Sequence, residues 1–166
     1  MRGFGRGRCV EALGDTSANP QTSFPRGRTV ERIQIRTFRQ SDIPSLVEIL
    51  KLNGQYDYPD IEGPDSMRRV ADCDAAVFLV AEIGKQPCGF IKAVYDGSRA
   101  LVHLLSVHPD YQHSGVGSAL VDAVSKELLR RGAPTASVTV TEKSAGFWEK
   151  KGFTRFPVFL MLKESR

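Results

Sequence analysis

Residues 101–120 constrain the fold of this chain more than any other segment, because they join three backbone patterns in a short stretch. Leu101 to Val107 is mainly apolar, as expected for a buried strand. A Pro-Asp turn and a loop with two glycines follow, and from Gly117 onward apolar residues recur with a helical period. The apolar face of this helix contains Leu120, Val121, Val124, Leu128 and Leu129. A strand followed at once by an amphipathic helix predicts a layered domain in which the helix packs on a sheet.

The loop between this strand and helix is also a candidate phosphate site. The first amides of a helix have no intrahelical acceptor, and the helix dipole places positive potential beside them. Gly115 and Gly117 would let a phosphate approach the backbone and would permit unusual dihedral angles. A Walker loop is excluded because Ser118 stands where it needs Lys, and the dinucleotide fingerprint is excluded because Leu120 replaces its third glycine. A tight turn without a phosphate remains the alternative.

The remaining segments predict one mixed α/β or α+β domain over residues 30–166. Strands are expected at 32–38, 76–83, 88–95, 136–141 and 156–162, and helices at 65–70, at 144–151 and from an N-cap at Ser41 to a stop at Asn53-Gly54. Residues 1–29 are rich in Gly, Arg, Pro and Ser and lack apolar periodicity. They predict a flexible basic tail, with an organellar transit peptide as a weaker interpretation.

The charge distribution argues against a nucleic-acid partner. Residues 1–30 hold five arginines against two acidic residues, a net +3, so only +1 of the total +4 belongs to the rest of the chain. A nearly neutral body lacks the basic surface of DNA- and RNA-binding domains, although a basic tail remains compatible with unspecific RNA contact. No apolar run approaches the roughly 20 residues that cross a bilayer, which argues against a membrane protein.

The cysteine and histidine spacings predict neither disulfides nor a metal site. Cys9, Cys73 and Cys88 are odd in number and widely spaced, which is typical of free thiols in a reducing compartment such as the cytoplasm. A cysteine nucleophile would need a histidine and an acid beside it in space. The three histidines recur every five residues, a spacing that suits neither a helical metal pair nor one face of a strand.

Two motifs in register resemble those of the GNAT superfamily of N-acetyltransferases. Gln112-His-Ser-Gly-Val-Gly117 fits the pattern Q/R-x-x-G-x-G/A, and Leu105 to Tyr111 is similar to the segment that precedes it in that family. Phe147-Trp-Glu-Lys-Lys-Gly-Phe153 resembles the aromatic-E-K-x-G-F ending of the same family. The similarity covers residues 32 to the C-terminus.

The resemblance implies a GNAT-like fold, a twisted and mainly antiparallel sheet flanked by helices, and acetyl transfer from acetyl-CoA to a primary amine. In that family the strand, here Leu105, Ser106 and Val107, binds the pantetheine arm. The amides of Gln112, His113, Ser114, Gly115, Val116, Gly117 and Ser118 would surround the pyrophosphate, and Thr141, Ser144 and Trp148 would line the rest of the cofactor site. The acceptor's identity and the oligomeric state, a homodimer included, are left open.

Three positions bear on the chemistry. His113 replaces a usual glycine, and Trp148 replaces a tyrosine that protonates the departing thiolate in many members. An indole N–H does not release its proton near neutral pH, so Trp148 is interpreted first as a core aromatic, and a catalytically silent CoA-binding module is the alternative function. His103 stands where many members carry the base that takes the acceptor's proton, and a histidine merely packed on a strand is an equal alternative.

The segment from Leu52 to Ser66 suggests the class of acceptor. It contains Asp57, Asp60, Glu62 and Asp65 together with Tyr56 and Tyr58, and no Lys or Arg. In the GNAT superfamily this region walls the acceptor side, and carboxylates with aromatic rings attract ammonium groups. A cationic amine is therefore one hypothesis, and a solvated acidic loop is the other.

The tail hypothesis makes a direct prediction. A chain that starts near Val30 should melt within a few degrees of the full-length protein and should bind acetyl-CoA equally well, because residues 1–29 have no periodic apolar face to pack. Thermal denaturation and calorimetric titration of both chains check this, and loss of folding on truncation would contradict it.

Overall fold

The computed structural model describes residues 32–158, so residues 1–31, which contain the predicted tail, and residues 159–166 lie outside the description. Five strands and five helices occur within the described residues. In chain order they are β1 (Gln34–Thr37), α1 (Ile43–Leu52), α2 (Pro59–Glu62), α3 (Pro64–Ala71), β2 (Ala76–Ile83), β3 (Gln86–Tyr95), β4 (Ala100–Val107), α4 (Val116–Arg130), β5 (Ala136–Val138) and α5 (Glu142–Lys150). Short 3-10 turns occupy Gln40–Asp42 and Pro109–Tyr111.

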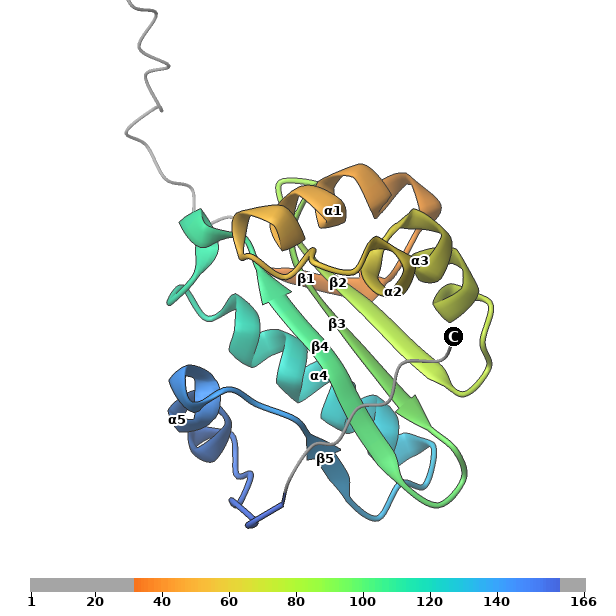
Figure 1. The fold of residues 1–166 in the computed structure, drawn as a ribbon, viewed down its shortest axis with the longest axis vertical. Coiled ribbons are helices and arrows are strands. Elements are labelled where there is room, and N and C mark those ends of the chain that lie inside the picture. Colours follow the sequence, from red (N-terminus) through yellow and green to blue (C-terminus); the bar gives the residue numbers. More distant parts are fainter. Residues whose placement is uncertain (1–31, 159–166) are drawn as a thin grey trace, which may run out of the picture. The chain divides into compact units, whose positions relative to one another are not determined.

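The strands form one sheet in the order β1-β2-β3-β4-β5 (Figure 1). The first four strands are antiparallel neighbours, and β5 runs parallel to β4. A two-residue loop joins β2 to β3, and its residues Gly84 and Lys85 both have left-handed φ values, 57° and 68°. This geometry is that of the tight hairpin turns whose twist matches the flanking strands. The predicted mixed, mainly antiparallel sheet is confirmed.

Helices cover both faces of the sheet, and alternate strand residues point to each. One apolar cluster joins α4 to Val77, Leu79 and Ala81 of β2, and the other joins α1 and α3 to Phe78 and Val80 of the same strand. Figure 1 shows α1 to α3 along one side of the sheet and α4 on the other. Because β2 is covered on both faces, its sequence is continuously apolar from Ala76 to Ala81.

A β-bulge interrupts the pairing of β4 with β3. Lys92 pairs with Leu104, whereas the next residue of β3, Ala93, pairs with Val102, so His103 is the extra residue. The bulge reverses the alternation along β4: Val102 and Leu105 both contact the cluster on the α4 side. The sequence predicted the strand at 101–107 but not this reversal. The apolar pattern of the strand fits a regular strand as well as a strand with an extra residue, so it does not reveal the bulge.

The sequence misplaced three element boundaries. Ser41 is not the N-cap of α1, because it lies in the 3-10 turn and Asp42 stands directly before the helix. The predicted strand 136–141 ends at Val138. Residues 156–158 of the predicted last strand are not in a strand, and its remaining residues lie outside the described range.

Asp42 anchors the start of α1 to the sheet. Its two carboxylate oxygens accept hydrogen bonds from the Arg36 guanidinium, each at 2.8 Å, and one of them also accepts the Arg39 N–H at 2.8 Å. Arg36 reaches Glu82 on β2 at 2.6 Å as well. The Asp42 side chain is 4% exposed, so this bidentate ion pair is largely shielded from water.

Removing this carboxylate should destabilise the protein. We expect Asp42→Ala to lower the free energy of unfolding by about 2 to 4 kcal/mol, because it removes two of the hydrogen bonds of a largely buried guanidinium, which keeps only Glu82 as an ion-pair partner, and leaves the Arg39 amide without its acceptor. The matched control is Asp65→Ala, which removes an 84% exposed carboxylate paired with Arg68 and should change stability by less than about 1 kcal/mol. Urea denaturation measures both, and equal losses would contradict the assignment.

Candidate active site

The loop before α4 presents an array of backbone donors. Gly115 is the N-cap of the helix with φ 94°, and no side chain caps the first turn. Among the described residues, Ala119 N–H donates to the Gly115 carbonyl, whereas the N–H groups of residues 113–118 find no acceptor. His113 also has a left-handed φ, 59°. Adjacent donors at a helix N-terminus, beside the positive end of its dipole, suit an anion such as a phosphate.

The two glycines of the loop serve different purposes. At Gly115 a Cβ would meet no atom within 4 Å, so the left-handed φ is what requires glycine. At Gly117 a Cβ would lie 3.5 Å from the Phe147 ring and 3.8 Å from Val107. A side chain at position 117 would therefore point toward α5 and β4. The expectation that both glycines clear a path to the backbone fits Gly115 better than Gly117.

Among residues 32–158, no strand pairs with the outer edge of the second half of β4. Its pairing with β5 covers only Ala100 to Val102, so β5 does not extend along the rest of the strand (Figure 1). The His108 N–H donates to the Cys88 carbonyl of β3 at 2.9 Å. Along an antiparallel pair of strands, residues whose main-chain groups bond the partner strand alternate with residues whose groups face away from it. The main-chain groups of Leu105 and Val107 therefore face away from β3. They form an edge to which an extended, amide-containing molecule can bind as an added strand does.

Side-chain amides connect this edge to the loop. Asn53 Nδ2 donates to Ser106 Oγ at 2.8 Å and to Val107 O at 2.9 Å, and Gln112 Nε2 donates to Asn53 Oδ1 and to Val107 O, each at 3.0 Å. Ser106, which is buried, donates to Gln55 Oε1 at 2.7 Å. The sequence missed Asn53 and Gln55, because only their position after α1 brings them to β4.

The other three residues predicted to line the cofactor site lie on α5 or at its N-cap. Thr141 and Ser144 contact one another through their hydroxyl oxygens at 3.2 Å at the start of this helix. Trp148 is buried and meets Phe147 and Phe153 edge to face, at centroid distances of 5.4 and 5.1 Å. These contacts agree with its interpretation as a core aromatic.

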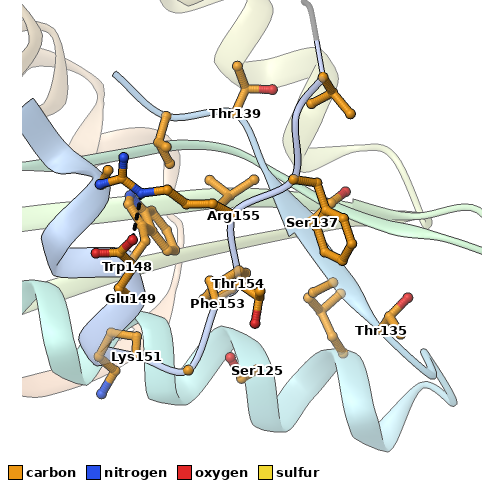
Figure 2. A pocket seen from close by; sticks show the side chains of 18 of the residues that line it. Ser125, Thr135, Ser137, Thr139, Trp148, Glu149, Lys151, Phe153, Thr154 and Arg155 are labelled. Atoms are coloured by element: carbon orange, nitrogen blue, oxygen red, sulfur yellow. Dashed lines mark hydrogen bonds and ion pairs between the residues drawn. The ribbon is translucent and has the colours of Figure 1, made fainter. Parts of the chain in front are cut away.

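A cavity on the α5 side of the described residues does not coincide with the loop and the strand edge. Its volume is about 1120 Å³, and it lies between the C-terminal half of α4, β5, α5 and the segment 151–158. Figure 2 shows Trp148 beside the ion pair of Arg155 and Glu149 in this cavity. Of the predicted site residues it contains Thr141 and Trp148 and none of residues 103–118. This cavity thus includes predicted residues of the α5 group only, although Phe147 of α5 lies beside Gly117 of the loop.

His103 lies at the bulge, next to a charged pair. The His103 side chain is exposed, although neighbouring protein atoms remove part of it from water. This partial loss of water is the main cause that lowers its pKa, and the positive charge of Lys92 is the second, while Glu62 acts in the opposite direction. Lys92 on β3 is buried and forms an ion pair with Glu62 of α2. A neutral imidazole at this position can accept a proton.

Comparison with known proteins identifies the family. Residues 74–155, about half of the chain, match the family model of the acetyltransferase (GNAT) domain. The chain belongs to the GNAT acetyltransferases. It is therefore an enzyme that transfers acetyl groups, and the acetyl donor of this family is acetyl-CoA. Of the two functions that the sequence left open, this favours the enzyme over the silent module.

Similar solved structures agree on the fold. The PaiA N-acetyltransferase of Thermoplasma acidophilum in complex with coenzyme A has a TM-score of 0.71 at 18% identity, over 77% of this chain and 93% of that one. An acetyltransferase of Trypanosoma brucei has a TM-score of 0.65 at 22% identity, over 80% and 100%. An aminoglycoside acetyltransferase from an uncultured soil metagenomic sample, in complex with sisomicin, has a TM-score of 0.64 at 14% identity, over 81% and 96%.

The described residues fit an acyl-CoA donor. The donor array at residues 113–118 suits a pyrophosphate, and the open edge at Leu105 and Val107 suits the amides of a pantetheine arm. Gln112 differs from these residues, because its side-chain amide donates to Asn53 and its main-chain N–H donates to Pro109 O at 3.2 Å, so both donors are already engaged. The assignment of single residues to the donor remains a prediction.

Other chemistries find less support in the described residues. Cys88 is buried, its thiol donates to Ala81 O, and burial raises its pKa to about 11, so it does not form a thiolate nucleophile near neutral pH. Cys73 is exposed, and Cys9 lies outside the described range. Residues 32–158 contain no group of three or more metal-ligating side chains and no helix of the length and hydropathy that would cross a membrane.

The geometry of the loop predicts a contrast between two alanine variants. Gly115→Ala should weaken acetyl-CoA binding about tenfold, because a left-handed L-residue costs about 1 to 2 kcal/mol and the loop would relax away from its donor arrangement. Gly117→Ala should bind within about threefold of the wild type, because its Cβ makes only ordinary contacts. Isothermal titration measures both affinities. A larger loss for Gly117→Ala than for Gly115→Ala would contradict this account of the loop.

Proposed function

We propose that this GNAT enzyme transfers the acetyl group to a primary amine and that His103 takes the proton that the amine loses. The observation that carries the proposal is the position of His103 at the bulge. It follows Val102, the last residue of β4 that pairs with β5, and it precedes the open edge at Leu105. A thioester bound along that edge would lie within a few residues of the imidazole.

The chemistry needs a base because an ammonium group cannot attack a carbonyl. The ammonium first loses one proton to solvent, and the lone pair of the resulting amine forms the new C–N bond. As the C–S bond of the thioester breaks, the nitrogen gives its second proton to His103, directly or through a water molecule. Backbone N–H groups of the β4 edge would stabilise negative charge on the acetyl oxygen without rearranging. Trp148 supplies shape and no proton, so solvent would protonate the departing thiolate.

For the acceptor we propose a cationic amine bound beside α2. Among the described residues, Glu62 is paired with Lys92 and Asp65 with Arg68, whereas Asp57 and Asp60 form no ion pair. These two carboxylates, next to the 67% exposed ring of Tyr58, support attraction of an ammonium group. The structurally similar protein that holds sisomicin is named an aminoglycoside acetyltransferase, which makes an amine acceptor reasonable on this fold.

We also propose a reducing compartment such as the cytoplasm. The two described cysteines, Cys73 and Cys88, are free thiols. A homodimer stays a prediction that sedimentation of the purified protein would test.

The role of His103 predicts a specific kinetic change. His103→Ala should lower kcat by roughly ten- to ten-thousand-fold and should leave acetyl-CoA affinity nearly unchanged. In the wild type the rate should fall on acidification as His103 becomes protonated. Because its pKa is lowered, this fall should be centred below the usual value of 6.5 if the histidine dominates, and the variant should lose it.

Two further variants serve as controls for this kinetic test. His103→Phe keeps an aromatic side chain on the strand and should be as slow as His103→Ala, which separates proton transfer from packing. Trp148→Tyr restores a group with a releasable proton, and a gain in kcat would indicate that thiolate protonation had limited the rate. Wild-type kcat and pH dependence in a well-folded His103→Ala protein would remove His103 from the mechanism.

A further inference from the structure

The bulge determines what His103 faces. Where two residues of a bulged strand oppose one residue of the partner strand, the extra residue escapes the regular alternation and its side chain can be redirected. Here His103 and Leu104 oppose Lys92 of β3. Leu104 packs against the apolar cluster on the α1 and α3 side. Lys92 lies directly opposite Leu104 on β3, so its side chain lies on that side too. The bulge thereby brings an imidazole next to a buried ammonium group.

Lys92 is an unusual residue for this position. It is 5% exposed in the middle of β3, and its neighbours on the same face include the fully buried Phe90. Its charge is compensated by Glu62, whose side chain reaches it from the end of α2. A buried ion pair adds little to stability compared with an apolar pair of similar volume, so stability is a weak explanation for a buried lysine here.

The pair is well placed to act on His103. The positive charge of Lys92 disfavours a second cation beside it, whereas Glu62 favours one, and partial burial of the ring adds to the effect of Lys92. The other cations of the covering helices are engaged elsewhere: Arg68 pairs with Asp65, Arg69 donates to Asp60 O, and Lys51 lies over the Tyr56 ring. Among the described residues, the carboxylates of Glu48 on α1 and Asp60 on α2 form no ion pair. The paired strand β5 carries no charged residue.

We infer that the Lys92–Glu62 ion pair is a positioning device of the active site, which holds His103 in its neutral, proton-accepting form on the acceptor side of the sheet. Lys92 and Glu62 act through His103 and need not contact the acceptor or the donor. The catalytic consequence rests on the role proposed for His103, whereas the protonation of the imidazole can be measured by itself.

The direct test is an NMR titration of the histidine ring protons. The chain has three histidines, and the His103→Ala spectrum assigns the signal of His103. Lys92→Met should shift the titration of His103 to higher pH, because the variant removes a positive charge and leaves Glu62 uncompensated. Glu62→Gln should shift it to lower pH. Lys85→Met, which removes an exposed lysine in the turn before β3, should leave it at the wild-type value.

The two substitutions protect the test against a folding defect. Lys92→Met fills the buried position with an apolar chain of similar length, and Glu62→Gln changes a partly exposed side chain at the end of a short helix. Thermal denaturation of each variant verifies the fold. An unchanged His103 titration in both folded variants, or an equal shift in Lys85→Met, would overturn the inference.

Kinetics of the same variants separate this inference from the proposed function. If the acidic fall of kcat moves with the NMR titration, in opposite directions for Lys92→Met and Glu62→Gln, both proposals are supported. If the NMR titration shifts but the acidic fall does not follow, the ion pair controls His103 and His103 is not the base. If the NMR titration does not shift but His103→Ala is slow, the base assignment stands and the inference about the ion pair is wrong.

Discussion

The short pairing between β4 and β5 is the constraint on which the rest of the site depends. Only Ala100 to Val102 pair with β5, so the main-chain groups of Leu105 and Val107 require other partners. Exposed strand edges readily add another strand, and proteins usually protect them. Here Asn53 and Gln112 hydrogen-bond the Val107 carbonyl, and Gln55 hydrogen-bonds the Leu105 carbonyl. Among the described residues, the N–H groups of this edge remain available for the acetyl donor.

Much of the fold could be predicted from local pattern. The helix at 116–130 and the strands at 76–83 and 86–95 have strong periodicity or continuous apolar runs, and tight turns separate them. The turn before α4 was recognisable because its left-handed backbone conformation at position 115 favours glycine, which the sequence displays directly. These features depend on neighbours within a few positions along the chain, which is why a single sequence reveals them.

What sequence could not predict depends on contacts across the sheet. The bulge at His103 follows from the register between β3 and β4, and the apolar pattern of β4 does not reveal that register. The positions of Asn53 and Gln55 next to Ser106 require the packing of α1 on β4. Ser41 was chosen as a helix cap from its chemistry, whereas the Arg36–Asp42 ion pair decides where α1 begins. Long-range partners, absent from local propensity, therefore set the details of the site.

The burial of Trp148 has a consequence for spectroscopy. It is the only tryptophan in the chain, so the intrinsic tryptophan emission comes from one position on α5. Its indole is packed between Phe147 and Phe153. Phe147 in turn lies beside Gly117 of the loop before α4, where a side chain at position 117 would contact the Phe147 ring. A small displacement of α4 at the loop would thus change the surroundings of the fluorophore. Trp148 is therefore a built-in optical reporter, linked through the Phe147 ring to the loop that is predicted to bind the donor.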